Sequence, residues 1–404
     1  MNARCASGPR LRARTPFALA GLLALGACAR HAHRSPAWPA RASIADSLQR
    51  TLVQARADSI FPGAIVILGT RDSILVTRSV GTLDWDPSAA VSDSTLWDIA
   101  SLTKLVALTT TIVTLVEDGR LTLDDTVRRF VPEWQVVGTE GVTVRDLLLH
   151  RAGLPAFKTF YKTATGRDTI RALVLATPLD TVPRTRMLYS DLGAIILGIL
   201  VERVTAQPFE VAVQARVLDP LGMSETRFNP PAMLRDRIAP TERDPWRGRL
   251  VHGEVHDENA YALGGVSAHA GLFASARDLV RFAQWWLGGP GPTGRAPLNP
   301  ALRTAFTTVD DSAFSSRALG WDTPTGANSA GTRMARPAFG HTGFTGTSLW
   351  MDPARDLFIL LLTNRVNPSR ERVGIAAVRV AVADAAVAWR DAARSGRLAR
   401  DASR

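Results

Sequence analysis

The sequence predicts an α+β fold in which an antiparallel sheet, built from both chain ends and flanked by helices, carries an inserted, mostly helical subdomain. Runs rich in β-branched residues occur near the N-terminus, at 63–69 and 73–81, and near the C-terminus, at 347–352 and 357–364. Between them, residues from about 98 to 335 have the pattern of helices and loops. With 404 residues, of which 46% are hydrophobic, the chain is long enough to bury one large core.

The remaining elements follow in order along the chain. An amphipathic helix is expected at 43–59, before the two N-terminal strands, which a tight turn joins. The two C-terminal strands are separated by a Pro-Ala-Arg-Asp run at 353–356. A long helix from about 371 to 393 closes the chain. The two terminal helices are therefore expected to cover the sheet.

The N-terminal residues predict a targeting segment. Arginines at positions 4, 10, 12 and 14 precede an apolar run at 17–27, which is too short to span a bilayer as a folded anchor. A Leu-Gly-Ala-Cys sequence ends at Cys28 and is similar to a bacterial lipobox, in which the Cys is acylated. We expect 1–27 to be a signal peptide, Cys28 to carry a lipid, and the protein to be exported to the cell envelope. The alternative is an ordinary secretory signal that is cleaved nearby.

Downstream of the leader we expect three parts. Residues 28–42 contain Pro36 and Pro39 among polar residues and are predicted to form a tether. Residues 43–395 form the main domain and 396–404 a C-terminal tail. No later segment is long and apolar enough to predict a membrane helix.

The composition argues against several function classes. The net charge is +11, but the basic residues are scattered without a run of five, so no nucleic-acid partner is expected. The two cysteines, Cys5 and Cys28, leave the main domain without a thiol for a disulfide, a zinc–thiolate site or a nucleophile. A His-Gly-Glu-Val-His run at 252–256 lacks the Glu directly after the first His that a zincin needs, so no metal is expected.

A Ser-Leu-Thr-Lys run at 101–104 places an amine one helical turn after a hydroxyl. Of 48 basic residues only three are lysines: Lys104, Lys158 and Lys162. Arg keeps its proton at any useful pH, whereas a buried Lys can release it, so Lys104 is a candidate proton acceptor. Residues three apart share a helix face, and the N–H groups of a helix N-terminus favour an oxyanion. The pattern predicts Ser101 as a nucleophile beside its base; the alternative for Lys104 is a solvated helix lysine.

Two further motifs lie downstream. A Tyr-Ser-Asp-Leu-Gly run at 189–193 opens an apolar helix, and a His-Thr-Gly-Phe-Thr-Gly run at 341–346 directly precedes the third strand. In this order and spacing, the three motifs resemble those of the serine β-lactamase and penicillin-binding-protein superfamily. The Tyr at the head of the second motif is similar to the class C branch. The resemblance covers about 45–390, with supporting stretches at 147–155, 220–223 and 319–321.

The resemblance implies a β-lactamase/transpeptidase-like fold and a role for each motif. Ser101 would attack a carbonyl carbon and form an acyl-enzyme. Lys104, with its pKa lowered by burial, would take or share the serine proton. Tyr189 would relay protons to the leaving group and activate the water that cleaves the acyl-enzyme.

The third motif would bind the substrate. The backbone N–H groups of Ser101 and Phe344 would form the oxyanion hole. His341 and Thr342, followed by Gly343, would line the strand edge along which the substrate lies. The resemblance implies no cofactor.

The sequence departs from the β-lactamase pattern at two positions. Asp191 stands where an Asn is usual, and its negative charge should raise the pKa of Lys104. His341 stands where a Lys usually supplies a fixed positive charge for a substrate carboxylate, and a His is mostly neutral at pH 7. Both changes weaken the interpretation as a potent β-lactamase and fit the broader set of esterases, amidases and peptidases with this fold.

A third region, at 255–260 and 263–273, contains His256, Asp257 and His269. It is similar to a subgroup of exported cell-wall hydrolases that includes N-acetylmuramyl-L-alanine amidases. These three residues are expected either to hydrogen-bond a loop near the pocket or to contact a sugar or peptide.

The main expectation is an exported serine hydrolase that acts through an acyl-enzyme on an amide or ester of peptidoglycan fragments, as a muramyl-L-alanine amidase does. Its partners would be such a fragment or another small acyl substrate, and the membrane through the lipid on Cys28. The alternatives are a D-Ala-D-Ala carboxypeptidase, a carboxylesterase or a weak β-lactamase. A non-enzymatic alternative is a wall-binding or β-lactam-sensing module that is acylated without turnover.

Overall fold

The computed structural model describes residues 41–401, except 311, 313–314 and 327. The described residues belong to one compact unit. The expected signal peptide, the lipid site at Cys28 and the tether as far as residue 40 lie outside the described residues, as does the end of the expected tail.

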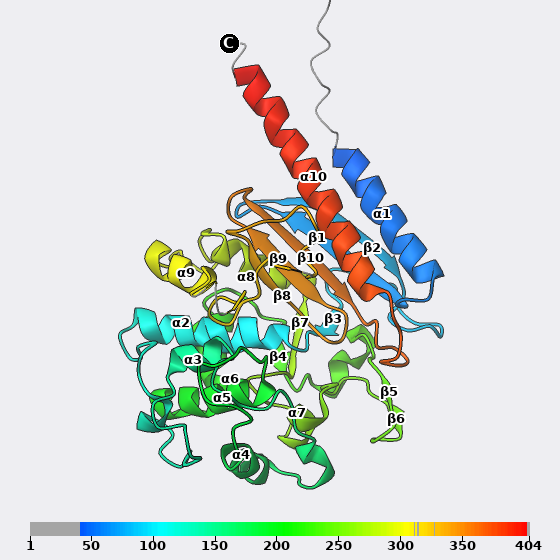
Figure 1. Cartoon of the computed structure of the whole chain (residues 1–404). Helices are drawn as coiled ribbons and strands as arrows, with labels where there is room; N and C mark the ends of the chain where they lie inside the picture. Colours follow the sequence, from blue (N-terminus) through cyan, green and yellow to red (C-terminus); the bar gives the residue numbers. More distant parts are fainter. Residues whose placement is uncertain (1–40, 311, 313–314, 327, 402–404) are drawn as a thin grey trace, which may run out of the picture. The chain divides into compact units, whose positions relative to one another are not determined.

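A five-stranded antiparallel sheet joins the two ends of the chain, as the sequence predicted (Figure 1). The N-terminal strand β1 pairs with the C-terminal strand β10, so that Ala64 lies opposite Thr363. In their order across the sheet, the strands are β2 (Ile74–Gly81), β1 (Gly63–Gly69), β10 (Leu357–Thr363), β9 (Ser348–Asp352) and β8 (Phe339–Thr342).

The edge strand β8 was not predicted. The sequence pattern placed the 341–346 motif ahead of a strand, whereas its first two residues belong to β8, where His341 lies opposite Leu349 of β9. The strand has only four residues, and one of them is Gly340, a residue type that strands usually avoid. A Cβ at Gly340 would lie 2.6 Å from the Trp350 ring, so only glycine fits at this position. Because glycine is unusual in strands, its presence hides the strand from sequence-based prediction.

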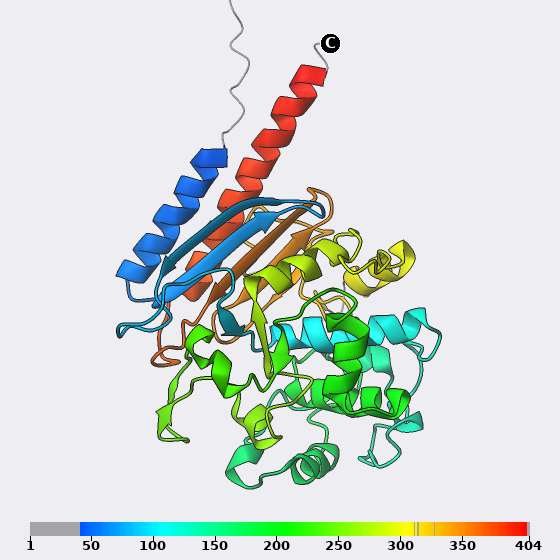
Figure 2. The same cartoon turned by 180° about the vertical axis from the view of Figure 1, so that it is seen from behind.

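Helices cover both faces of this sheet. α1 (Arg41–Ala57) and α10 (Ile375–Asp401) lie side by side on one face, and α8 (Ala276–Trp286) packs on the other (Figures 1 and 2). α10 begins later than the expected 371 because Gly374, at φ +102°, interrupts helical geometry. It runs past the expected end at 393 because no proline follows to stop it.

The two faces of β1 explain its continuous apolar pattern. All seven residues of the strand are buried. Ile65 and Ile67 pack into the core shared with the helical region, whereas Ala64, Val66 and Leu68 pack against α1 and α10. A strand that is buried on both faces therefore replaces polar–apolar alternation with a run of apolar residues.

The middle of the chain forms the helical subdomain, with two small sheets that the sequence did not predict. Strands of two to four residues are too short to show a period of two. They are β3 (Leu96–Asp98), β7 (Leu272–Ser275) and β4 (Arg227–Phe228) in one sheet, and β5 (Arg243–Asp244) with β6 (Arg249–Leu250) in the other. The helices and helical turns are η1 (Lys104–Thr109), α2 (Thr110–Glu117), η2 (Val127–Arg129), α3 (Val144–Leu148), η3 (Phe160–Lys162), α4 (Arg167–Leu175), α5 (Asp191–Thr205), α6 (Phe209–Val213), η4 (Gln214–Leu218), η5 (Ala232–Arg237), α7 (Glu258–Ala262) and α9 (Pro300–Thr307).

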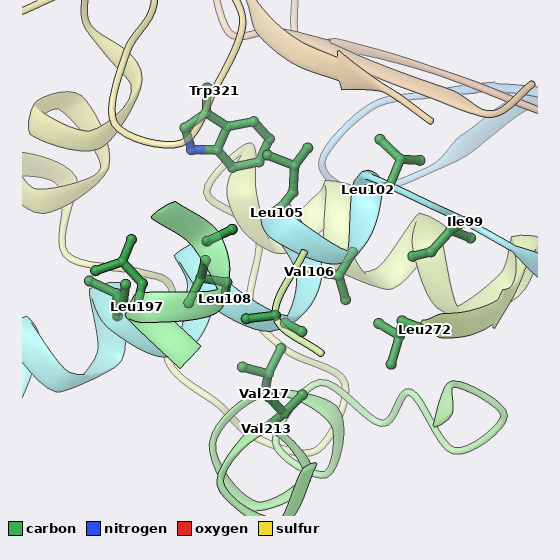
Figure 3. Packing of buried hydrophobic residues seen from close by; sticks show 14 of the residues in the cluster. Ile99, Leu102, Leu105, Val106, Leu108, Leu197, Val213, Val217, Leu272 and Trp321 are labelled. Carbon is green, nitrogen blue, oxygen red and sulfur yellow. The ribbon is translucent and has the colours of Figure 1, made fainter. Parts of the chain in front are cut away.

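The segment that follows β3 lies inside the largest hydrophobic core. Leu102 and Leu105 are fully buried and belong to a cluster that also contains side chains of β7, α5 and η4 (Figure 3). Full burial on the apolar side fixes the rotation of this helix and therefore the direction in which its polar residues point.

Within the described part of the chain, no single helix combines the length and apolarity of a membrane span. α5 and the helical stretch Phe209–Leu218 have that length and apolarity only when they are taken together, and the pair is bent by 74°. Residues 192–201 of α5 are buried in the core of this structure.

Candidate active site

Ser101 lies in a tight connection between β3 and the buried helix, which begins at Leu102. The preceding residue, Ala100, adopts φ +46°, a left-handed conformation that is uncommon outside glycine. Asp98 stabilises this backbone, since its Oδ1 accepts a hydrogen bond of 2.8 Å from the Ala100 N–H. Ser101 is thereby held at a helix N-terminus, where free N–H groups gather.

Lys104 follows one turn later and is 3% exposed. Its Nζ donates to Ser101 Oγ at 3.2 Å and to the backbone carbonyl of His269 at 2.9 Å. The same nitrogen lies 2.7 Å from Oδ1 of Asp191. The structure therefore brings the serine and the lysine together as the spacing predicted, and excludes the alternative of a solvated lysine.

The protonation of Lys104 differs from what the family resemblance implied. Burial alone would lower the pKa of Lys104, but the carboxylate of Asp191 and the oxygen of Tyr189 outweigh burial and raise it above its ordinary value. The expectation of a lysine with a lowered pKa is therefore wrong for this chain, and the effect expected of Asp191 is confirmed. In the resting site Lys104 is an ammonium paired with a carboxylate.

The second motif reaches this pair from the start of α5. Ser190 caps the helix, since its Oγ accepts a hydrogen bond from the Gly193 N–H at 3.3 Å and donates one to the Pro155 carbonyl at 2.6 Å. Asp191 is therefore the first residue of the helix, facing Lys104, and Tyr189 is the last residue of the preceding loop.

Four side chains surround the Tyr189 ring. Lys104 Nζ lies 5.0 Å from the ring centroid, and the guanidinium carbon of Arg317 lies 4.9 Å from it. The rings of His150 and His341 are 4.5 and 5.5 Å away, centroid to centroid. The Tyr189 hydroxyl is buried, and its oxygen interacts with Lys104 closely enough to raise the pKa of that lysine. A buried phenol with two cations beside it is well placed to carry a proton.

The third motif forms the turn between β8 and β9. The backbone N–H groups of Ser101 and Phe344 donate no hydrogen bond to any described residue. Gly343 packs so tightly that a Cβ there would lie 2.1 Å from Thr347 Oγ1 and 2.5 Å from the Ile99 carbonyl oxygen. This close approach joins the turn to the Ser101 connection, next to two free donors of the kind that an oxyanion requires.

Two threonines and an arginine fix this turn. Thr345 Oγ1 donates to the Asp98 carbonyl at 2.7 Å, and Thr347 Oγ1 donates to the Ile99 carbonyl at 3.2 Å. From α10, Arg379 Nη2 donates to the carbonyls of Gly343 at 2.8 Å and Thr347 at 2.7 Å. Burial, with Arg365 nearby, lowers the pKa of Arg379 to about 10.

His341 is neutral in this site. Its Nδ1 lies 2.7 Å from the Thr342 carbonyl oxygen, which can only accept, so Nδ1 carries the proton. Burial, together with the positive charge of Arg317, holds the pKa of His341 well below its ordinary value. Its Nε2 is a buried acceptor with no partner among the described residues. Position 341 therefore supplies no positive charge at neutral pH.

The 255–273 region adjoins the site through the His269 carbonyl, which accepts from Lys104 Nζ, and its imidazoles are engaged by hydrogen bonds. The backbone N–H of His256 donates to Asp98 Oδ2 at 2.6 Å, and its Nε2 donates to Glu242 Oε2 at 2.8 Å. His269 Nε2 pairs with Asp257 Oδ1 at 2.8 Å, which lowers the pKa of Asp257 despite its burial. The ring nitrogens of His256 and His269 are bound to Glu242, Asp257 and Ser267, which matches the expected hydrogen bonding of a loop near the pocket.

This region also contacts the turn between β8 and β9. The His256 ring stacks on the Phe344 ring with centroids 5.6 Å apart. Burial would raise the pKa of Glu242, but the hydrogen bond from His256 and those from Arg370 lower it to about 2. Glu242 therefore stays ionised and connects the stacked histidine to Arg370, which also pairs with Glu258 at 2.6 Å.

Four residues at the site were not predicted as members of it: Asp98, His150, Arg317 and Arg379. His150 lies in the stretch 147–155 that supported the family resemblance; its Nδ1 accepts the Ser190 N–H at 3.1 Å, and burial lowers its pKa. Asp98 precedes Ser101 by only three residues, and this proximity to the first motif is the one feature of the sequence that could have indicated its role. Arg317 and Arg379 come from distant segments, and nothing in the sequence around them indicates that they reach the site.

Surface cavities lie elsewhere on the subdomain. One of about 640 Å³ is lined by α4 and α5, with Arg167, Arg171 and Glu202 in its wall. At the site itself, Lys104 and His150 line a small cavity of about 10 Å³. Among the described residues, no three His, Cys, Asp or Glu side chains are grouped as metal ligands would be.

Comparison with known sequences gives a family. The Beta-lactamase family matches residues 48–383. A protein of Salmonella gallinarum named "Putative D-alanyl-D-alanine carboxypeptidase" is 30% identical over 357 residues, which cover 78% of this chain and 81% of the relative. A protein of the same name from Escherichia coli K12 is 31% identical over 317 residues, or 70% of this chain and 72% of the relative.

Comparison with solved structures gives the fold. A penicillin-binding-protein homologue from Caulobacter crescentus superposes with a TM-score of 0.70 and 22% identity, covering 86% of this chain and 97% of that one. A class C beta-lactamase superposes with a TM-score of 0.68 and 20% identity, covering 86% of this chain and 96% of that one. At these identities the likeness confirms the predicted fold class.

Proposed function

Because this chain belongs to the beta-lactamase family of serine hydrolases, we propose that it removes the terminal D-alanine from peptides that end in D-alanyl-D-alanine. The observation that carries the proposal is the 3.2 Å contact between Lys104 Nζ and Ser101 Oγ, beside two backbone N–H groups that have no acceptor. The names of the relatives support a carboxypeptidase rather than the muramyl-L-alanine amidase that the 255–273 region suggested.

The proposed reaction begins with attack of Ser101 Oγ on the carbonyl carbon of the penultimate D-alanine. The carbonyl oxygen becomes negative and accepts hydrogen bonds from the Ser101 and Phe344 N–H groups. The C–N bond then breaks, the peptide stays on Ser101 as an ester, and D-alanine leaves after it gains a proton. Water then attacks the ester carbonyl carbon, one of its protons passes to Ser101 Oγ, and the C–Oγ bond breaks to release the shortened peptide as a carboxylic acid.

Proton transfer falls to Tyr189 and the Lys104–Asp191 pair. As an ammonium, Lys104 cannot accept the Ser101 proton, and it instead donates to Oγ in the resting state. We assign to Tyr189 a concerted relay, in which its hydroxyl gives its own proton to the leaving amine nitrogen as its oxygen takes the proton of Ser101 Oγ, so that the phenol is neutral before and after the step. Positive charge from Lys104 and Arg317 stabilises the negative charge that develops on the tyrosine oxygen during this relay.

Product analysis tests the proposal. The purified full-length protein is incubated with an N-acylated peptide ending in D-Ala-D-Ala, a muropeptide, a short-chain ester and a fluorescent penicillin. Free D-alanine is the expected product, and Ser101→Ala should lower its release by at least about 10⁴-fold. The exposed Ser224→Ala serves as the matched control.

Other outcomes contradict the proposal in distinct ways. Release of the intact peptide from muramic acid, without free D-alanine, identifies an amidase. Penicillin labelling that persists while no substrate is turned over identifies an acylated sensor.

We also propose that the protein is exported and held on a membrane by a lipid on Cys28. The support is the Arg-rich leader, the apolar run and the lipobox-like Leu-Gly-Ala-Cys sequence. Cys28→Ser should move the protein from the membrane fraction to the soluble fraction of the envelope. Equal membrane retention of both forms would contradict lipid anchoring at this residue.

A further inference from the structure

We propose that Arg317 binds the free carboxylate of the substrate's terminal residue, in place of the residue at position 341. This inference rests on the proposed carboxypeptidase function and names the group that would select its substrate. Arg317 comes from the segment that leads into Trp321, and it reaches the site beside Tyr189.

The guanidinium of Arg317 has unused hydrogen-bonding capacity. Its side chain is 12% exposed, and its Nη1 is buried with no partner among the described residues. Asp322 is a carboxylate near Arg317, but its Oδ2 lies 3.9 Å from Nη2, which is too long for a hydrogen bond. A buried guanidinium with an unpaired terminal nitrogen is unfavourable, and a planar anion relieves this by accepting two parallel hydrogen bonds.

Other cations around the site are already engaged. Lys104 contacts Asp191, Ser101 and the carbonyl of His269. Arg379 donates through Nη2 to two backbone carbonyls of the turn between β8 and β9; its buried Nε has no described partner, but it is a single inner nitrogen, whereas Nη1 of Arg317 is a terminal one. Arg365 donates to the carbonyl of Phe344 at 3.1 Å and to two further carbonyls.

His341 cannot replace Arg317 as the anion-binding group. Its Nδ1–H is bound to the Thr342 carbonyl, and its Nε2 is an acceptor that would repel a carboxylate. The motif that would usually hold a fixed cation therefore has none, while a cation from a different segment lies on the same tyrosine ring.

The position of Arg317 also fits the geometry of the leaving group. Arg317 and Lys104 lie 4.9 and 5.0 Å from the centroid of the Tyr189 ring, and Lys104 contacts Ser101. In a leaving D-alanine, the amine that receives the proton is only about 2.5 Å from the carboxylate carbon. A group that protonates this amine must therefore lie next to the group that binds the carboxylate. An amidase that cleaves before L-alanine of a longer peptide has no free carboxylate at this place.

Binding measurements test this without relying on turnover. The Ser101→Ala protein is titrated by calorimetry with an N-acyl-D-Ala-D-Ala peptide and with the same peptide as its C-terminal carboxamide. We expect the carboxylate form to bind more tightly, and Arg317→Met to reduce the ratio of the two affinities by about 10- to 100-fold. Arg129, which lies over the ring of Phe130 at 5.1 Å outside the site, provides the matched control as Arg129→Met.

A second variant separates recognition from folding. In Arg317→Met/His341→Lys the lysine supplies a cation at the usual position, and the affinity ratio should recover by at least about 10-fold. If Arg317→Met weakens both peptides equally, Arg317 only supports Tyr189 and the inference is wrong. If neither peptide binds to the Ser101→Ala protein, the inference is also wrong. Carboxylate-selective binding without release of D-alanine by the wild-type protein would overturn the proposed function but keep this inference.

Discussion

Arg379→Met is expected to lower kcat by about 10²-fold with little change in KM. Arg379 Nη2 donates to the carbonyls of Gly343 and Thr347, at 2.8 and 2.7 Å, and these residues bracket Phe344. Methionine fills similar space but donates no hydrogen bond, so the turn is free to rotate the Phe344 N–H away from the developing oxyanion. Loss of one oxyanion donor lowers kcat by roughly 10²–10³-fold, and a displaced donor corresponds to the lower end.

The same substitution should change stability much less than activity. The shift of the Arg379 pKa from 12.5 to about 10 means that the fold disfavours its charged form by up to about 3 kcal/mol. This penalty is fully present below pH 10 and is relieved as the pH rises towards 12.5. Methionine removes the penalty together with two charge-assisted hydrogen bonds that contribute about 1.5–3 kcal/mol each. These terms oppose each other, so the free energy of unfolding should fall by no more than about 3 kcal/mol.

Steady-state kinetics and denaturant unfolding, measured on the same preparations, check both statements. Arg390→Met is the control, because Arg390 is on the same helix and donates to the Arg355 carbonyl at 2.9 Å, away from the site. Equal kcat values for the Arg379 and Arg390 variants would refute the proposed role of Arg379. A rise in KM alone would also refute it, since an oxyanion donor acts on the transition state rather than on the bound substrate.

Three further outcomes follow from the site. Asp191→Asn removes a main cause of the raised Lys104 pKa, so the limb of the pH–kcat/KM profile that reports Lys104 should move to lower pH; an unmoved limb would show that its charge does not limit acylation. His150 and His341 both have lowered pKa values, so the unfolded chain binds more protons, and the free energy of unfolding should decline below about pH 6.5 by up to about 1.4 kcal/mol per pH unit for each; His341→Gln should flatten that decline, and an unchanged slope in acid-unfolding titrations would contradict it. Gly343→Ala should lower kcat by about 10²-fold or more, because its Cβ would lie 2.1 Å from Thr347 Oγ1; wild-type kcat would show that the turn can yield.

The side chains of the three motifs could be found from the sequence because their chemistry depends on residue type. A lysine among arginines, next to a serine, signals an ionisable partner, and the structure does place Lys104 against Ser101. Arg379 gives no such signal, since it is one arginine of 45 and acts by contacting backbone carbonyls that any residue has. Such contacts depend on where α10 crosses the sheet, and that is decided by packing over the whole fold.

The fold shows the same division between local and distant information. The strands β1 and β10 are apolar throughout and could be identified, and their pairing follows because both need burial on two faces. The edge strand β8 could not be identified from the sequence, because the Trp350 ring of the neighbouring strand leaves room only for glycine at position 340. Residues that are chosen to fit a distant partner contradict the local pattern, and they concentrate where the site is built.

The charge balance of the site connects its two departures from the family pattern. An Asn at position 191 and a Lys at position 341 would leave two cations, at 104 and 341, without a carboxylate partner. In this chain Asp191 neutralises Lys104, and the neutral His341 contributes nothing. Two cations then remain near the motif: Arg379, which is bound to backbone carbonyls, and Arg317, whose described carboxylate partner is 3.9 Å away. Of the two, Arg317 lies on the Tyr189 ring, where a substrate carboxylate would replace the cation–anion contact that position 341 no longer provides.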